Sequence, residues 1–197
     1  MKDFDFEAVN VSVKEVVFNK ERVIEVINTE KVDEPDENTF AKLKNSSFKN
    51  GRIDVDVYSQ LLEDAPEHAR GFIGLAFRIN ETDDYFESFY IRPTNGRIED
   101  PIRRNRAVQY FAYLNHTFDY FRERGITDYE GPADIGLNEW IHLTVILDNQ
   151  KASFLVNDKK VLEVMPLIHS ETSGGIGFFV DIGTRAYYKN INIQVKD

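Results

Sequence analysis

The chain has 197 residues, and its 24 lysines and arginines against 34 aspartates and glutamates give a formal net charge of −10. The absence of cysteine excludes disulfides, thiolate catalysis and cysteine-ligated zinc, and the acidic balance argues against nucleic acid or an anionic membrane as a partner. No apolar run approaches the ~20 residues of a membrane helix, and residues 1–11 lack a basic and then apolar leader, so we expect a cytoplasmic protein.

Branched and aromatic side chains dominate the composition. Valine and isoleucine occur 17 times each, against 11 leucines and 10 alanines, and 25 further residues are aromatic. Such side chains suit the pleated surface of a sheet, whereas leucine and alanine favour helices. We therefore predict an all-β protein, and the length is typical of one domain that spans residues 1–197.

Period-two alternation of apolar and polar residues predicts the strands of the first half. The expected strands cover residues 9–18, 22–28, 40–43, 53–58, 72–79 and 85–92. The predicted connections are turns at 19–20, 50–51 and 80–84 and loops over 30–38 and 63–70.

The second half begins with residues 93–107, which lack apolar periodicity and predict a long loop. A short helix is expected over 117–125, because Thr117 can cap its start and Gly125 can take the left-handed conformation that stops it. Further strands are expected over residues 108–113, 140–147, 152–156, 161–164, 176–181 and 185–195. About twelve short strands at hairpin spacing predict a sandwich or barrel of antiparallel sheets.

Three stretches carry a family resemblance. They are FKNGRIDVDV (48–57), NEWIHLTVILDNQKASFLVNDKKV (138–161) and GGIGFFVDIGTRAYYKNINIQV (174–195). Together they resemble the concanavalin A-like lectin/glucanase superfamily, in its laminin-G-like and keto-glycoside-hydrolase-like branches. The resemblance covers most of the chain from Phe48 onward and implies a two-sheet antiparallel jelly roll whose concave face often holds a carbohydrate. It leaves the function open, because this fold hosts lectins, adhesion modules and glycosidases.

The catalytic pattern of one branch is incomplete here. Laminarinase-like members carry three carboxylates on one strand in the order acid-x-acid-x-x-acid. The corresponding positions here hold Asp54, Asp56 and Ser59, so the third carboxylate is missing. We therefore carry no catalytic role over from that pattern.

Arginine replaces lysine through the middle of the sequence. Between Lys49 and Lys151 the chain has ten arginines and no lysine, and segment 92–106 has a net charge of +3 from Arg92, Arg97, Arg103, Arg104 and Arg106 against two acids. A guanidinium pairs bidentately with carboxylate, sulfate or phosphate and stacks on aromatic rings. Two interpretations stay open: these arginines, with Asn95, bind a ligand, or they tie a long loop to the surplus carboxylates.

A predicted hairpin favours the ligand interpretation. If Gly74 lies opposite Tyr90, one face of strands 72–79 and 85–92 is a continuous apolar core face. The other face then presents Gly74 and Ala76 as a floor, with Arg78, Tyr90 and Arg92 around it. Small residues beside aromatic and guanidinium groups leave space in which a sugar ring could stack. The alternative is that the small residues accommodate an overlying loop.

Two further strands offer polar residues on a non-core face. Trp140 and His142 alternate with core positions and either join the concave site or pack as a pair at the rim of a sheet. Gln109, with Tyr113 or alternatively Tyr110, can contribute similarly. The acidic turns at 33–37 and 83–84 could hold a structural calcium or be solvated, and we predict no other metal or cofactor.

We therefore expect a carbohydrate-binding jelly-roll module for an anionic or hydroxyl-rich saccharide, with no oligomeric state indicated. One alternative is a glycoside hydrolase of the same fold, with Glu87 and Asp134, or one of Asp54 and Asp56, as the carboxylates. A second alternative is a structural or protein-interaction domain. The expected ligand-binding residues are Arg78, Tyr90, Arg92, Asn95, Arg97, Arg103, Arg104, Gln109, Tyr110, Trp140 and His142.

Overall fold

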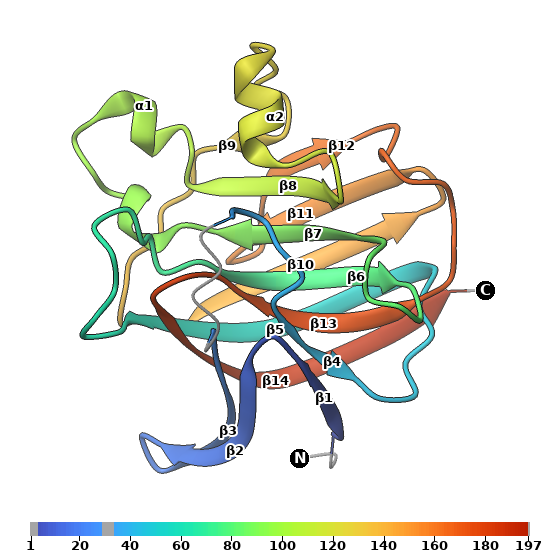
Figure 1. The fold of residues 1–197 in the computed structure, drawn as a ribbon, viewed down its shortest axis with the longest axis horizontal. Coiled ribbons are helices and arrows are strands. Elements are labelled where there is room, and N and C mark those ends of the chain that lie inside the picture. The colour runs from blue at the N-terminus through green and yellow to red at the C-terminus, as the bar shows by residue number, and fades with distance from the viewer. Residues whose placement is uncertain (1–3, 29–33, 197) are drawn as a thin grey trace.

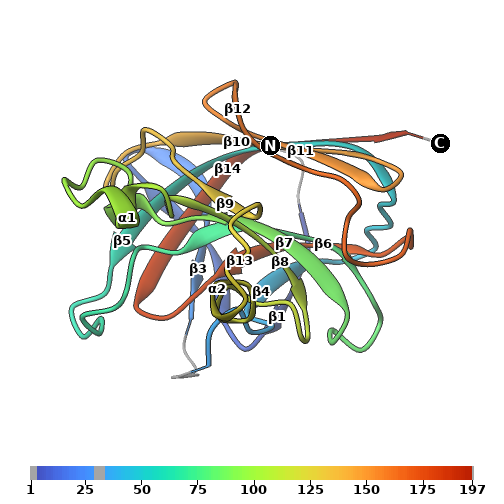
Figure 2. The same ribbon diagram turned by 90° about the horizontal axis from the view of Figure 1, so that it is seen from above.

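Two antiparallel sheets of seven strands each pack face to face in the computed structural model, which describes residues 4–28 and 34–196. Sheet A has the order β1 (Phe6–Val9), β4 (Phe40–Leu43), β13 (Gly175–Val180), β6 (Ile73–Ile79), β7 (Phe86–Ile91), β8 (Val108–Tyr113) and β9 (Glu130–Gly131). Sheet B has the order β12 (Lys159–Val164), β11 (Lys151–Val156), β10 (Ile141–Asp148), β5 (Asn50–Leu61), β14 (Thr184–Lys196), β3 (Glu21–Ile27) and β2 (Ser12–Phe18). The prediction of an all-β antiparallel sandwich is confirmed (Figures 1 and 2).

The main core fills the space between the sheets. Alternate residues of each strand point inward, as their period-two pattern requires, and sheet B contributes fully buried Ile53, Val55 and Leu143. Sheet A contributes Leu75 and Phe89, among others. The predicted register of β6 on β7 is confirmed, with Gly74 opposite Tyr90.

A second apolar cluster covers the outer face of sheet A. It contains Phe111, Phe179 and Tyr90, and Phe121 of helix α2 (Phe118–Glu123) packs onto it. Figure 2 shows α2 on the outer side of this sheet. Ala76 is fully buried in this cluster, so the predicted open floor is instead filled by aromatic side chains. Open space on this face is left toward the Arg92 end of β7.

Three local predictions differ from the structure. The expected strand 9–18 is divided at Asn10, whose φ of 54° turns the chain from β1 in sheet A to β2 in sheet B. Residues 50–51 lie inside β5 and not in a turn, with Gly51 paired to β14. The expected loop 93–107 contains the short helices η1 (Pro93–Asn95) and α1 (Pro101–Arg104).

The expected helix at 117–125 is present as α2, and Gly125 ends it with a φ of 67°. Thr117 is its N-cap residue, although its side chain does not cap the backbone. Among the helices of the described residues, none has the length and apolar character that a membrane span requires.

Candidate functional site

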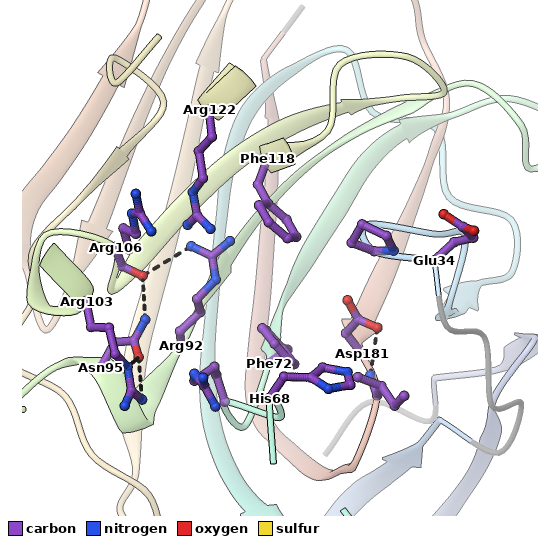
Figure 3. Close-up of a pocket in the computed structure, with 13 residues that line it drawn as sticks. Glu34, His68, Phe72, Arg92, Asn95, Arg103, Arg106, Phe118, Arg122 and Asp181 are labelled. Carbon is purple, nitrogen blue, oxygen red and sulfur yellow. Dashed lines mark hydrogen bonds between the residues drawn. The ribbon is translucent and has the colours of Figure 1, made fainter. Parts of the chain in front are cut away.

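A pocket of about 320 Å³ opens on the outer face of sheet A, where β7 and β13 end. Loop 63–70, segment 93–106 and α2 build its walls over these strand ends. Figure 3 shows the side chains that line it. They are Glu34, Pro35, His68, Arg70, Phe72, Arg92, Asn95, Arg103, Arg106, Phe118, Arg122, Asp181 and Ile182.

Arg92 forms the base of the pocket and is held on several sides. Its guanidinium donates to the Arg106 carbonyl at 3.1 Å, to the Tyr90 hydroxyl at 2.6 Å and to Oε1 of Gln109 at 3.2 Å. It also lies over the Phe118 ring, with Cζ 5.2 Å from the centroid. These contacts fix the orientation of a charged group that has lost most of its water, since Arg92 is only 3% exposed.

Three of the arginines share one carboxylate as their counter-charge. Glu130 lies 2.8 Å from Arg122, 3.4 Å from Arg106 and 3.9 Å from Arg92. A single negative charge shared by three guanidinium groups leaves this side of the pocket positive.

Arg70 and Arg103 add positive charge with no carboxylate at salt-bridge distance among the described residues. Neither forms a salt bridge within 4.0 Å in the described part of the chain. Arg70 donates to the carbonyls of Glu67 and Ala69, whereas Arg103 donates to the side-chain oxygen of Asn95 at 3.1 and 3.0 Å. Burial, followed by repulsion from Arg103 and Arg92, lowers the pKa of Arg70. The arginines are therefore close enough to oppose each other's charge, and an anion would relieve that repulsion.

The sequence around Arg103 explains how it reaches the pocket. Asp100 caps α1 by accepting from the backbone amides of Ile102 at 2.9 Å and Arg103 at 3.3 Å, and Pro101 occupies the first turn. This turn directs Arg103 toward Asn95, whose amide also donates to the Arg106 carbonyl at 3.1 Å.

Two buried carboxyl groups lie on the other side of the site. Burial raises the pKa of Asp181, which lines the pocket, to about 6. Burial raises the pKa of Asp36, behind the pocket, to about 7, even though Arg92 lowers it. Asp36 accepts from the Tyr90 hydroxyl at 2.8 Å and from the Phe118 amide at 2.7 Å. Partial protonation of both acids near neutral pH further reduces the negative charge around the arginines.

Figure 3 shows an asymmetric arrangement in the pocket. Arg103 and Arg106 lie to the left of Arg92 and Arg122 lies above it, whereas Glu34, His68 and Asp181 lie to the right. The rings of Phe72 and Phe118 lie between the two sides. Cations on one side, hydrogen-bonding groups opposite and aromatic rings between them suit a small polar molecule that carries a negative charge.

The structure brings part of the predicted set together. Arg92, Asn95 and Arg103 line the pocket, as does Arg106 from the same segment. Tyr90 and Gln109 are buried beneath it and bond to Arg92.

Arg78, Glu87 and Tyr110 lie inside the sandwich and not in the pocket. Sheet A has a bulge at Arg78, since Gly175 pairs with Ile79 and the next residue pairs with Phe77. Arg78 takes a φ of 55° there, and its side chain bonds to the Lys49 and Asn149 carbonyls. The expected outward position of Arg78 is therefore wrong, because a bulge interrupts the alternation of side chains.

Buried Arg78 lies 3.7 Å from Glu87, whose other carboxylate oxygen accepts from the Tyr110 hydroxyl. Glu87 is fully buried, and burial raises its pKa. A carboxyl group sealed between two sheets is out of reach of a saccharide on the surface.

Other predicted residues are exposed but lie outside the pocket. Arg97 pairs with Asp134 at 2.6 Å and with Glu139 at 2.9 Å. Arg104 donates to the carbonyls of Ile98 and Glu99, which closes the turn before α1. For these two arginines the scaffolding interpretation describes the observed contacts.

Trp140 and His142 belong to the sheet B side of the sandwich. His142 bonds through Nδ1 to Asp56 at 2.7 Å and through Nε2 to Asp54 at 3.3 Å, both on the outer face of β5. Burial opposes the charged imidazole, but the bonds to these two carboxylates raise the pKa of His142. Trp140 and His142 therefore do not line the pocket on sheet A, because β10 lies in the other sheet.

Sequence reasoning missed His68, Arg70, Phe72, Phe118, Arg122 and Asp181 as lining residues. The sequence could have indicated Phe72 as a lining residue, because the predicted register places it opposite Arg92. The sequence did not indicate Asp181, because this residue directly follows β13 and the position of β13 beside β6 depends on the long-range topology.

The acidic turns show no cluster of metal-binding side chains among the residues that the structure describes. No group of three or more His, Asp or Glu side chains that could hold a metal ion occurs within residues 4–28 and 34–196. Asp83 pairs with Lys42 at 2.6 Å, and Asp33 of the other acidic turn lies outside the described residues.

Comparison with known proteins identifies the architecture. Neither a family model nor a curated protein sequence matches this chain. Among solved structures, it is similar to the carbohydrate-binding module CBM66 from Bacillus subtilis, with a TM-score of 0.59 and 13% identity over 93% of this chain and 94% of that one. A putative glycosyl hydrolase from Parabacteroides distasonis has a TM-score of 0.55 and 14% identity over 93% and 83%.

The β-glucanase of Bacillus licheniformis gives a TM-score of 0.53 and 10% identity over 95% of this chain and 83% of that one. The fold is therefore the concanavalin A-like jelly roll, and its structural neighbours include proteins that bind or hydrolyse carbohydrates.

Proposed function

Because the chain has the concanavalin A-like jelly-roll fold and an arginine-lined pocket on sheet A, we propose that it binds a saccharide that carries an anionic group or is rich in hydroxyl groups. The single observation that carries the proposal is the charge imbalance of the pocket. Arg70 and Arg103 lack a carboxylate partner within the described residues, and Arg92, Arg106 and Arg122 share Glu130.

Short-range contacts, and not long-range attraction, would supply the affinity. The protein as a whole is acidic, so its distant field repels an anion, and salt screens charges beyond ~8–10 Å. A bidentate bond from a fixed guanidinium is roughly twice as strong as a neutral hydrogen bond. The rings of Phe72 and Phe118 would pack against the apolar faces of the sugar ring.

The test uses two adjacent arginines of α1. Arg103 lines the pocket, whereas Arg104 bonds to the carbonyls of its own loop. Calorimetric titration with methyl glucuronide, methyl galacturonide, a sulfated hexose and the corresponding neutral methyl hexosides should give binding for at least one anionic sugar. Arg103→Gln should weaken that binding about tenfold, and Arg104→Gln should leave it unchanged. Equal affinities in the two variants would mean that the arginines are scaffolding.

One observation favours glycoside hydrolysis as a second function. Asp181 lines the pocket with a pKa of about 6, a value suited to a general acid. Hydrolysis needs a second carboxyl group ~5–5.5 Å away in retaining enzymes or ~6.5–9.5 Å away in inverting ones. Glu34 is the other acid that lines the pocket. Release of nitrophenol from nitrophenyl glycosides, abolished by Asp181→Asn and not by Asp148→Asn, would establish this function in place of simple binding.

A further inference from the structure

A second hollow adjoins the pocket at the β9 edge of sheet A. It has a volume of about 440 Å³ and lies between α1 and segment 127–132. Arg106 lines both the pocket and this hollow. Glu130 also lines the second hollow, and it pairs with Arg106 at 3.4 Å and with Arg122 at 2.8 Å. Arg106 is therefore the residue that the two spaces share, and Glu130 holds it from the side of the second hollow.

The second hollow borders the pocket on its arginine side, because Arg106 lines both. Arg106 and Arg103 lie on that side in Figure 3, whereas Glu34, His68 and Asp181 bound the opposite side. A saccharide that places its anionic group against the arginines can continue across Arg106. Its next unit would then enter the second hollow.

The second hollow differs from the pocket in its chemistry. Its only described charged groups are Arg106 and Glu130, which are already paired with each other. The remaining lining is uncharged: Asn105 and Thr127 offer hydrogen bonds, and Pro132 and Ile102 offer apolar surface, with Ile102 62% exposed. Amide and hydroxyl groups beside apolar carbon suit a neutral sugar ring, and Glu130, which lines this hollow but not the pocket, would repel a second acidic group.

From this juxtaposition we infer that the ligand is at least a disaccharide, with a terminal acidic unit in the pocket and a neutral unit in the second hollow. The inference rests on the proposed function and adds the length and the charge order of the ligand. The order follows from the position of the unpaired cations, Arg70 and Arg103, which line the pocket and not the second hollow.

Titrations with four probes test the inference: methyl glucuronide, glucuronic acid linked to xylose, diglucuronic acid and xylobiose, with the galacturonic counterparts in parallel. The acid–neutral disaccharide should bind at least about tenfold more tightly than the acidic monosaccharide. The diacid should show no such gain, and xylobiose should bind most weakly.

A variant that fills the second hollow tests whether the additional affinity of the disaccharide arises there. Thr127 is exposed in the second hollow and does not line the pocket, so Thr127→Trp should remove the gain of the disaccharide and preserve the affinity for methyl glucuronide. Thr172→Trp, at an exposed position outside both spaces, is the matched control.

Equal binding of the monosaccharide and the acid–neutral disaccharide would overturn the inference and leave the proposed function standing. A gain that survives in Thr127→Trp would also overturn it. If the wild-type protein binds no uronate, the inference is overturned; if it also binds neither the sulfated hexose nor the neutral hexosides, the proposed function is overturned as well.

Discussion

The hydroxyl of Tyr90 donates a hydrogen bond of 2.8 Å to Oδ1 of Asp36, beneath the floor of the pocket. The same hydroxyl accepts from Nη2 of Arg92 at 2.6 Å. Asp36 also accepts from the amide of Phe118, the first residue of α2. One buried carboxyl group thus connects sheet A, the segment that contains Asp36, and the helix that carries a wall of the pocket.

This connection predicts the effect of Tyr90→Phe. Removing the hydroxyl leaves Oδ1 of Asp36 buried without its donor, which costs about 1–3 kcal/mol of the free energy of unfolding. Urea denaturation measures the loss. Tyr120→Phe, on a partly exposed ring of α2, should change stability by no more than about 0.5 kcal/mol. Equal stability of Tyr90→Phe and the wild type would show that the hydrogen bond contributes nothing net.

The acids near the pocket predict a pH dependence of stability. The folded-state pKa of Asp36, about 7, and that of Asp181, about 6, both exceed the ordinary value of 3.8 because of burial. The folded protein therefore holds protons that the unfolded chain releases, and the contribution of these groups to stability falls as pH rises from about 4 to about 7.

The variant Asp36→Asn removes the carboxyl group that has the larger of the two pKa shifts. Its free energy of unfolding should fall less between pH 5.5 and pH 7.5 than that of the wild type, measured by urea denaturation at both values. Asp148→Asn, at an exposed position in β10, should keep the wild-type dependence. Parallel pH profiles of Asp36→Asn and the wild type would rule out Asp36 as the source.

Sequence patterns predicted most of the sandwich because its strands alternate strictly. Strand β8 was expected and is observed at residues 108–113, and the register of β6 on β7 followed from keeping Phe89 and Ile91 in the core. Two of the failures lie where a residue with positive φ breaks the alternation. Asn10 moves the chain from one sheet to the other, and Arg78 turns inward at a bulge. A period-two pattern contains no signal for either event.

Only the part of the pocket that segment 92–106 forms could be predicted from the sequence. The arginine-rich composition of segment 92–106 pointed to Arg92 and Arg103, and both residues line the pocket, Arg92 just before η1 and Arg103 within α1. Asp181 and Phe118 reach the pocket from distant parts of the chain. Their positions depend on β13 lying beside β6 and on α2 packing over the outer cluster, which are long-range properties that strand patterns do not encode.

The buried pair of Arg78 and Glu87 predicts a large cost for breaking it. Arg78→Met would leave the Lys49 and Asn149 carbonyls without their donor and Glu87 without its counter-charge. Removing one partner of a buried ion pair typically costs about 3–5 kcal/mol. The double variant Arg78→Met/Glu87→Leu should lose less stability than the sum of the two single variants in urea denaturation. Strict additivity would mean that the two charges do not interact.

The last prediction separates the geometry of Arg92 from its charge. Arg92→Lys keeps the positive charge, but a lysine ammonium cannot reproduce the planar set of bonds to the Arg106 carbonyl, Tyr90 and Gln109. We expect the affinity for an anionic sugar that binds the wild type to fall at least about tenfold, because the base of the pocket loses its fixed fork of donors. Calorimetry measures the affinity and the number of sites, so a fall caused by unfolding would appear as a reduced number of sites. Lys159→Ala, an exposed lysine of β12 on the other sheet, should leave the affinity unchanged. If Arg92→Lys binds the sugar as tightly as the wild type, Arg92 serves the fold alone, and the ligand lies elsewhere.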